Sequence, residues 1–389
     1  MHTITRNAQN ELDLEKNFLP EETLEFLRDR SNFMSVPVGI KRELRRLGFN
    51  PRDYFGLLSD FKSVLKKAGF TIDQRKNAKT WLIEGKLPSP RHNYPIRLCF
   101  AFGLKGQDAL TFLWNVCRVN GFNFRRAEDV IYYYCLENGK DYDAAVDLIE
   151  RYDKYADCDQ LMASDSTKQT RTLRDLFGDP GTLDETDFFE LLCSNKKNFI
   201  GYSKTAHKEF VGIYSKLKSL LSAKIESYNQ YQRDYYNDMQ GYNSAASVYP
   251  EIVFAFDEIS GVSHGAGSTF AVIMENFPQI RYLTEMFRIP AAATDKEHDK
   301  ARKAFILLFF ALYALDLPPD SFYNDFFCAL NGKLYKCGYA RLYPANPFDW
   351  LILKCVKSLD HCDPEEDFNP IELFNEILEL LAAEEAQAF

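Results

Sequence analysis

The sequence predicts an all-α protein built as a multi-helix bundle, and three observations lead to this prediction. Apolar residues recur at helical spacing in several long segments, glycines follow those segments as stops, and the period-two alternation typical of strands is nearly absent. Residues 251–256 (EIVFAF) form the one short strand-like run, and they fit a buried helix equally well. The length of 389 residues suggests two to three domains, and 46% hydrophobic with 26% charged residues excludes a disordered or collagen-like chain.

The first half of the chain contains three well-marked helical segments. Residues 53–68 place their aromatic and aliphatic side chains at helical spacing, and Gly69 is a natural C-terminal stop. Residues 127–138 form the next expected helix, which ends before Gly139. Residues 141–155 follow, with acidic side chains in their first turns, where the helix dipole favours negative charge. We therefore expect helices over all three ranges.

The second half begins with a change of composition. Residues 158–172 are polar and rich in Ser and Thr, which is typical of a linker, and residues 205–239 then form a long helical candidate without proline. Residues 304–317 are the most apolar stretch, but a bilayer requires about twenty residues, so this stretch is expected to be a buried core helix. Further on, Asn346 and Pro347 suit the N-cap and the first turn of another helix.

Two distant segments share a pattern that suggests an internal repeat. In residues 97–150 and again in 310–381, two helices are followed by a Gly-aromatic pair, a loop, and a helix that opens with Asp129 or Asp349. A duplication and a chance match both agree with these spacings. If the duplication is real, the two units should superpose, because the same apolar spacing imposes the same packing faces.

These observations divide the chain into three helical parts and a linker. The expected parts are an N-terminal helical domain (1–157), the linker (158–172), a central domain with a long helix (173–300), and a C-terminal unit (301–389) that resembles residues 97–150.

The cysteines and the first residues indicate a compartment. The nine Cys show no C-x-x-C spacing, which favours neither a zinc site nor a disulfide framework. The first seventeen residues lack the apolar region of a secretory signal. We therefore expect a cytoplasmic protein outside the membrane, with all nine Cys unbridged and no bound metal or cofactor.

Positive charge is concentrated in one part of an acidic chain. Residues 41–97 contain 14 Lys and Arg against 5 Asp and Glu, a net charge of +9, whereas the whole chain carries −9 and the remainder therefore −18. A localised basic region on an acidic protein is the electrostatic pattern expected of a nucleic-acid site.

Within this region, residues 73–104 carry a recognisable motif. One part has the form Trp-x-x-x-Gly-Lys-x-Pro-Ser, and the other is an apolar helix that ends in Gly-Leu. The matching residues are Trp81, Gly85, Lys86, Pro88 and Ser89 in the first part, and Ile96, Leu98, Ala101, Phe102, Gly103 and Leu104 in the second. Over residues 61–119 the chain thus resembles the Cro/lambda-repressor (XRE-like) class of helix-turn-helix domains, although the Gln-x-x-Leu-Ala pattern usual before the turn is absent.

The resemblance implies a recognition helix that contacts duplex DNA. Such a helix needs cationic and polar side chains on the face opposite its packing residues, which here are Ala78, Trp81 and Leu82. The expected nucleic-acid-binding residues are Arg75, Lys76, Asn77, Lys79, Lys86 and Arg91. A solvated basic helix of a purely structural bundle, or a surface for an acidic protein, would show the same charges.

No other motif reaches the same specificity. Residues 261–268 (GVSHGAGS) lack the layout of a phosphate-binding loop, and His361, Cys362 and Asp363 read as a polar loop. The pair Asp184–Glu185 suits a helix N-terminus better than a catalytic pair, since no apolar surroundings raise a carboxyl pKa there.

The leading hypothesis is therefore a non-enzymatic, DNA-binding regulatory protein of the helix-turn-helix type. The alternative is a helical interaction or adaptor module, for example in a bacterial defence or toxin–antitoxin system, and an enzyme with an unfamiliar site in residues 173–300 is a third reading. The expected partners are double-stranded DNA, together with a protein partner or a second copy bound through the C-terminal region. That region carries ten acidic residues and one Lys between positions 357 and 389.

Overall fold

The predicted all-α class is confirmed. The computed structural model describes residues 3–13, 20–50, 53–89, 93–119, 121–157, 175–177, 183–199, 204–227, 269–274, 277–278, 282, 286, 298–315, 323–360 and 369–387. Within these ranges 16 α-helices account for the fold and no strand occurs. The strand-like run 251–256, the linker 158–172 and the far end of the predicted helix 205–239 lie outside the described residues.

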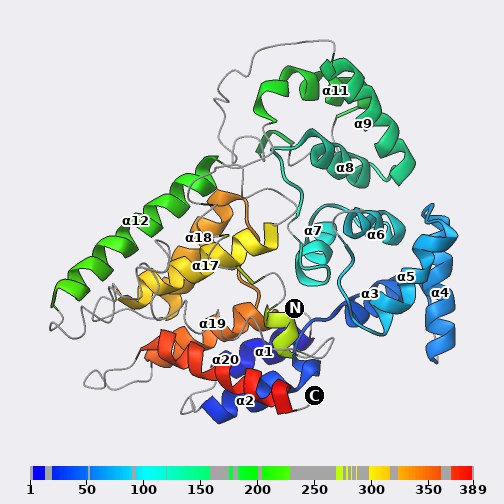
Figure 1. The fold of residues 1–389 in the computed structure, drawn as a ribbon. Helices are drawn as coiled ribbons and strands as arrows, with labels where there is room; N and C mark the ends of the chain where they lie inside the picture. Colours follow the sequence, from blue (N-terminus) through cyan, green and yellow to red (C-terminus); the bar gives the residue numbers. More distant parts are fainter. Residues whose placement is uncertain are drawn as a thin grey trace.

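One group of helices encloses a hydrophobic core formed mainly by the first half of the chain (Figure 1). Its helices are α3 (Val36–Arg46), α4 (Tyr54–Lys67), α5 (Ile72–Leu82), α6 (Tyr94–Phe102), α7 (Gly106–Asn115), α8 (Ala127–Glu137), α9 (Tyr142–Asp157) and α11 (Glu185–Ser194).

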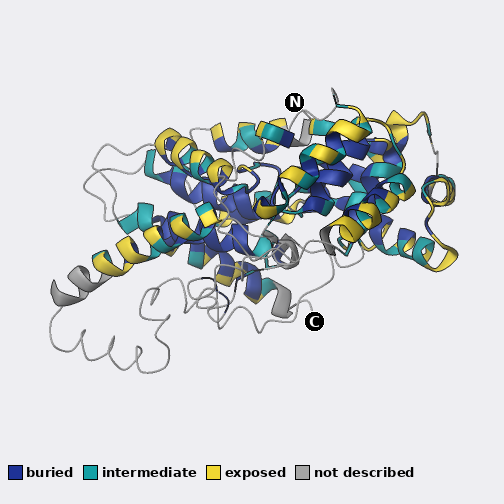
Figure 2. Cartoon of the chain, turned by 90° about the horizontal axis from the view of Figure 1, so that it is seen from above, coloured by how far each residue is buried: buried dark blue, intermediate teal, exposed yellow. Residues whose placement is uncertain are grey.

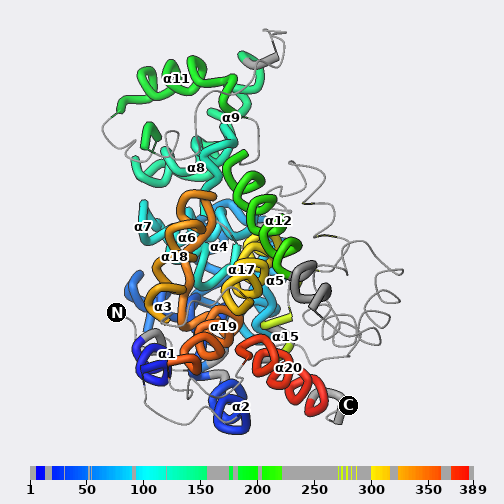
Figure 3. Tube along the Cα trace, turned by 90° about the vertical axis from the view of Figure 1, so that its left-hand side faces the viewer, coloured from blue at the N-terminus to red at the C-terminus, as the bar shows by residue number. Residues whose placement is uncertain are grey.

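A second group encloses another core and joins the N-terminus to the C-terminal helices. Its helices are α1 (Thr3–Asp13), α2 (Pro20–Arg28), α12 (Lys204–Ser227), α15 (Thr269–Met274), α17 (His298–Leu315), α18 (Tyr323–Cys337), α19 (Pro347–Lys357) and α20 (Pro370–Gln387). Figure 3 shows α1 and α2 beside α19 and α20 at one end, with α8, α9 and α11 at the other. Buried residues run through both groups, and exposed residues lie on the outer helix faces (Figure 2).

The cores combine segments that are far apart in the chain. Trp350 is fully buried, stacks on Phe26 with ring centroids 4.6 Å apart, and donates its indole N–H to the carbonyl of Ala8 at 3.2 Å. This places α1 and α2 in the core of the C-terminal helices, whereas the sequence interpretation grouped residues 1–157 together. The described residues of 173–300 also divide, since Phe188 belongs to the first core and Phe210 to the second.

Local signals set the helix boundaries. Asp53 caps α4 by accepting a hydrogen bond from the Gly56 amide at 2.7 Å, and Asn346 caps α19 by accepting from the Phe348 amide at 3.0 Å. After α8, Gly139 takes a φ of +65°, a conformation that glycine adopts without steric cost. The helix starts near Asp53 and Asn346 and the helix end before Gly139 agree with the sequence prediction. The predicted buried helix in residues 304–317 corresponds to α17.

The structure contains no helix, within the described residues, that is both long enough and apolar enough to cross a membrane.

The helix starts at Asp129 and Asp349 share their hydrogen bonds. Each carboxylate accepts from the backbone amide six residues earlier, of Asn123 or Tyr343, at 2.8 Å. In each loop a backbone turn closes at 2.8 Å, from the Arg126 amide to the Asn123 carbonyl and from the Asn346 amide to the Tyr343 carbonyl. This common local structure favours the internal repeat, which remains a prediction for the complete units.

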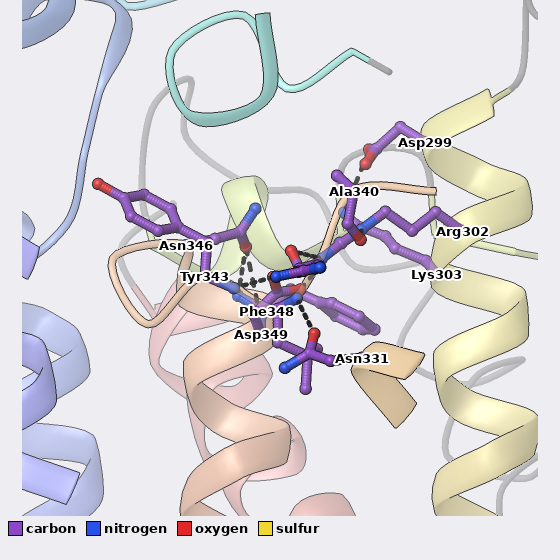
Figure 4. A network of polar contacts seen from close by, with 11 residues as sticks. Asp299, Arg302, Lys303, Asn331, Ala340, Tyr343, Asn346, Phe348 and Asp349 are labelled. Atoms are coloured by element: carbon purple, nitrogen blue, oxygen red, sulfur yellow. Dashed lines mark hydrogen bonds and ion pairs between the residues drawn. The ribbon is translucent and has the colours of Figure 1, made fainter. Parts of the chain in front are cut away.

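Asp349 also anchors a buried polar network (Figure 4). The guanidinium of Arg302 donates to both carboxylate oxygens of Asp349, at 2.9 and 2.6 Å, and to the carbonyls of Ala340 and Arg341 at 2.9 and 3.0 Å. Burial by itself lowers the pKa of Arg302, but the carboxylate of Asp349 more than offsets this and raises it, so Arg302 stays charged. The network fixes α17 to the loop after α18 and to the start of α19.

The Cys residues in the described part of the chain are all unbridged, and most are buried. Burial raises the pKa of Cys135 and of Cys337 to about 12, so both remain protonated, and therefore unreactive, near pH 8. Cys328 is exposed. In the native protein at pH 8 we expect a thiol reagent such as DTNB to modify Cys328 quickly and these two buried Cys only after unfolding.

The matched variant C328S should lose one rapidly reacting thiol per chain. The total number of thiols measured in denaturant should fall by the same one. An unchanged number of rapidly reacting thiols in C328S would contradict the described environment of this residue.

Candidate nucleic-acid interface

The basic region folds into two consecutive helices joined by a short turn. The helix α4 ends at Lys67, residues 68–71 form the turn, and α5 begins at Ile72. Gly69 has a φ of +76°, which favours glycine, and Thr71 and Gln74 form a capping box at the start of α5. The chain thus places a helix, a turn of four residues that contains glycine, and a second helix in succession.

Arg97 holds this turn in place. Its side chain is only 9% exposed, and its guanidinium donates to the Gly69 carbonyl at 3.2 Å and to Oε1 of Gln74 at 3.1 Å. The same group stacks over the rings of Phe70 and Tyr142, at 4.2 and 4.8 Å from their centroids. Arg97 therefore contributes to the structure rather than to a contact surface. Sequence reasoning missed this role, although the position of Arg97 between Ile96 and Leu98 on an apolar helix was a signal.

The packing side of α5 was predicted correctly. Ala78, Trp81 and Leu82 are all buried. Trp81 is 3% exposed, and its ring packs edge-on against Tyr94 with centroids 5.3 Å apart. The remaining residues of α5 are consequently turned toward solvent or lie at the edge of the packed face.

The predicted contact residues of α5 differ in exposure and in pairing. Lys76 and Lys79 are exposed, whereas Arg75 and Asn77 are half-buried. Lys76 forms an ion pair with Asp73 at 2.7 Å, and this contact lowers the pKa of Asp73. Within the described residues, Lys79 has no acidic partner. Lys79 is therefore the cation of α5 whose charge is best placed for a ligand.

Two further predicted residues follow α5. Lys86 is exposed and lies 3.0 Å from a carboxylate oxygen of Glu84. Arg91 lies outside the described residues. The structure thus brings Arg75, Lys76, Asn77 and Lys79 together on one helix, with Lys86 just beyond its end.

The neighbouring helices add cations that the sequence prediction had not included among the site residues. On α3, Arg42 and Arg46 both pair with the buried Glu43 at 2.8 Å, but Lys41 and Arg45 are exposed. On α4 the exposed cations are Lys62, Lys66 and Lys67. Because α3, α4 and α5 pack against one another, these cations belong to neighbouring helices. We call the following set the basic cluster: Lys41, Arg45, Lys62, Lys66, Lys67, Arg75, Lys76 and Lys79.

The basic cluster is accompanied by exposed apolar side chains. Phe55 at the start of α4 is 81% exposed, and Ile72 at the start of α5 is 73% exposed. Leu47 and Ile83, at the ends of α3 and α5, are 41% and 45% exposed. The three helices therefore present both positive charge and apolar area to solvent.

The weaker candidates have structural explanations or lie outside the described residues. Asp184 caps α11 through the Asp187 amide at 2.9 Å, and Glu185 pairs with Lys140 and Arg151 at 2.5 Å each, so this acidic pair is a helix start as predicted. Residues 261–268 and 361–363 are not among the described ranges. In the part of the chain that is described, no group of three or more His, Cys, Asp or Glu side chains is placed to hold a metal ion.

No family model, no curated protein and no solved structure matches this chain.

Proposed function

We propose that this chain is a cytoplasmic, non-enzymatic regulatory protein that binds double-stranded DNA through the basic cluster. The helix α5 enters the major groove, and Arg75, Asn77 and Lys79 approach the base edges. The cations of α3 and α4, together with Lys76 and Lys86, hold the flanking phosphates. The second helix group carries the binding site for a protein partner or a second copy.

The observation that supports this proposal most directly is the surplus of exposed cations without acidic partners. In the described part of the chain, exposed Lys41, Arg45, Lys62, Lys66, Lys67 and Lys79 and half-buried Arg75 form no ion pair with an acid. Positive charge gathered on three neighbouring helices of an acidic chain attracts a polyanion. The short turn between α4 and α5 provides the frame that DNA-binding proteins use to present a helix to the major groove.

Binding to duplex DNA is expected to weaken steeply as salt rises. Each phosphate contact contributes about 0.9 to the slope of log K against log salt concentration, since binding releases a condensed counterion. Replacing Lys79 by Ala should lower that slope by about 0.9 and weaken binding at every salt concentration. Fluorescence anisotropy with a labelled pool of genomic duplexes, measured at several salt concentrations, tests both expectations.

The matched control is K154A, which removes an exposed lysine from α9, outside the basic cluster. It should leave both the affinity and the salt slope unchanged. If the wild-type chain fails to bind duplex DNA at low salt, the proposal is wrong. If K79A and K154A behave alike, the DNA-binding site lies elsewhere.

A second candidate function is binding of an acidic protein, and the exposed apolar residues favour it. Phe55 and Ile72 would contribute to a protein interface, whereas phosphate contacts do not require them. The variant F55S separates the two functions. Its affinity for duplex DNA should equal that of the wild type if DNA is the ligand of the basic cluster. Its affinity for an acidic protein should fall if Phe55 contributes to a protein interface.

A further inference from the structure

A cavity of about 360 Å³ lies where the two helix groups meet. One wall contains Trp114 of α7, Phe122 of the following loop and Tyr133 of α8. The other wall contains Tyr335 of α18, together with Tyr339 and Arg341 of the loop after it. Its volume is within the range of small-molecule sites, about 300–1,000 Å³. The cavity is separate from the basic cluster, none of whose residues lines it.

The aromatic wall on the α7–α8 side is already assembled. The Tyr133 ring packs against Phe122 and Phe124, with centroids 5.2 and 5.5 Å apart. Rings fixed by other rings lose little side-chain entropy on binding, so the cavity suits a flat, apolar molecule.

Two glycines from corresponding places in the two suggested repeat units also line the cavity. A Cβ atom at Gly121 would lie 2.4 Å from a methyl carbon of Leu110 and 2.9 Å from Nε1 of Trp114, so a larger residue would disturb this wall. Gly338 has a φ of +85° and ends α18, and the next amide, of Tyr339, donates to the Leu334 carbonyl at 2.8 Å. A side chain at position 121 would displace Leu110 or Trp114, and the backbone at Gly338 has a conformation that other residues rarely adopt.

Arg341 supplies the charge. Its side chain is exposed, its guanidinium lies over the Tyr335 ring at 5.1 Å, and within the described residues it has no acidic partner. Its backbone is held firmly, because its carbonyl accepts a hydrogen bond from buried Arg302 at 3.0 Å. A guanidinium that stacks on a ring at the edge of an aromatic cavity is well suited to a carboxylate.

We propose that this cavity binds a small planar aromatic carboxylate, whose rings pack between the aromatic walls. Arg341 binds the carboxylate at the opening. The bound molecule contacts both helix groups and stabilises their arrangement. This site does not depend on the DNA-binding function.

The probe for the test is 6-fluoro-2-naphthoate, observed by ¹⁹F NMR with the full-length chain, and the comparison compound is the neutral 6-fluoro-2-naphthamide. The carboxylate should bind at least about 10-fold more tightly than the amide, as expected for a hydrogen bond to a charged group. R341Q should weaken binding of the carboxylate by about 10-fold and reduce its preference over the amide. The matched control K336Q removes an exposed charge from the end of α18 that does not line the cavity, and should bind like the wild type.

Circular dichroism melting curves establish that each variant is folded. The proposal is overturned if the wild type does not bind the naphthoate at millimolar concentration, if it binds acid and amide equally, or if folded R341Q binds as tightly as the wild type.

Discussion

Replacing Asp349 by Ala is expected to lower the free energy of unfolding of the C-terminal core by about 3–5 kcal/mol. Asp349 is fully buried, and its carboxylate holds Arg302 through two hydrogen bonds at 2.6 and 2.9 Å. The variant leaves the guanidinium buried with its charge uncompensated and also deprives the Tyr343 amide of its acceptor. Both effects act in the same direction, because buried groups without partners carry the full cost of lost hydration.

Urea unfolding followed by circular dichroism measures this loss. The matched control D325A removes a carboxylate from the exposed side of α18 and should change stability by less than about 0.5 kcal/mol. The double variant R302M/D349L should recover most of the loss, since a buried ion pair replaced by apolar residues of similar volume is often neutral. If D349A unfolds at the same urea concentration as D325A, the described network does not stabilise the core.

Replacing Trp81 by Ala is expected to destabilise the α3–α6 region by about 3–5 kcal/mol. The indole is 3% exposed and contacts the rings of Phe61, Phe70 and Tyr94, with centroids 5.3 to 6.4 Å away. Removing it leaves a cavity beneath the helix that presents Lys79. We therefore expect this variant to lose DNA binding together with the structure of α5.

The comparison with K79A makes this prediction specific. K79A should lose affinity and show a smaller salt slope at unchanged stability. W81A should lose both affinity and stability, whereas W81F should retain most of each. Thermal unfolding and DNA anisotropy on the same samples distinguish these outcomes. A W81A protein as stable as the wild type would show that the indole is not part of the core.

The sequence by itself determined the helices and the packing side of the candidate site. The N-cap at Asn346, the stop at Gly139 and the buried face of Trp81 follow from residues within one or two helical turns. Interactions of this kind depend on spacing along the chain, which the sequence displays directly. The basic charge of residues 41–97 was equally visible, since charge is a property of composition.

Only the tertiary structure decided which of these residues act on one another. It assigned Arg97 to the turn before α5, paired Arg302 with Asp349, and placed Trp350 against Phe26 and Ala8. It also formed the cavity between Trp114 and Arg341, which are more than two hundred residues apart. A buried Arg beside its partner and an exposed Arg beside water look the same in a sequence. Their difference lies in the loss of hydration and in contacts across the fold, which arise only when distant helices pack together.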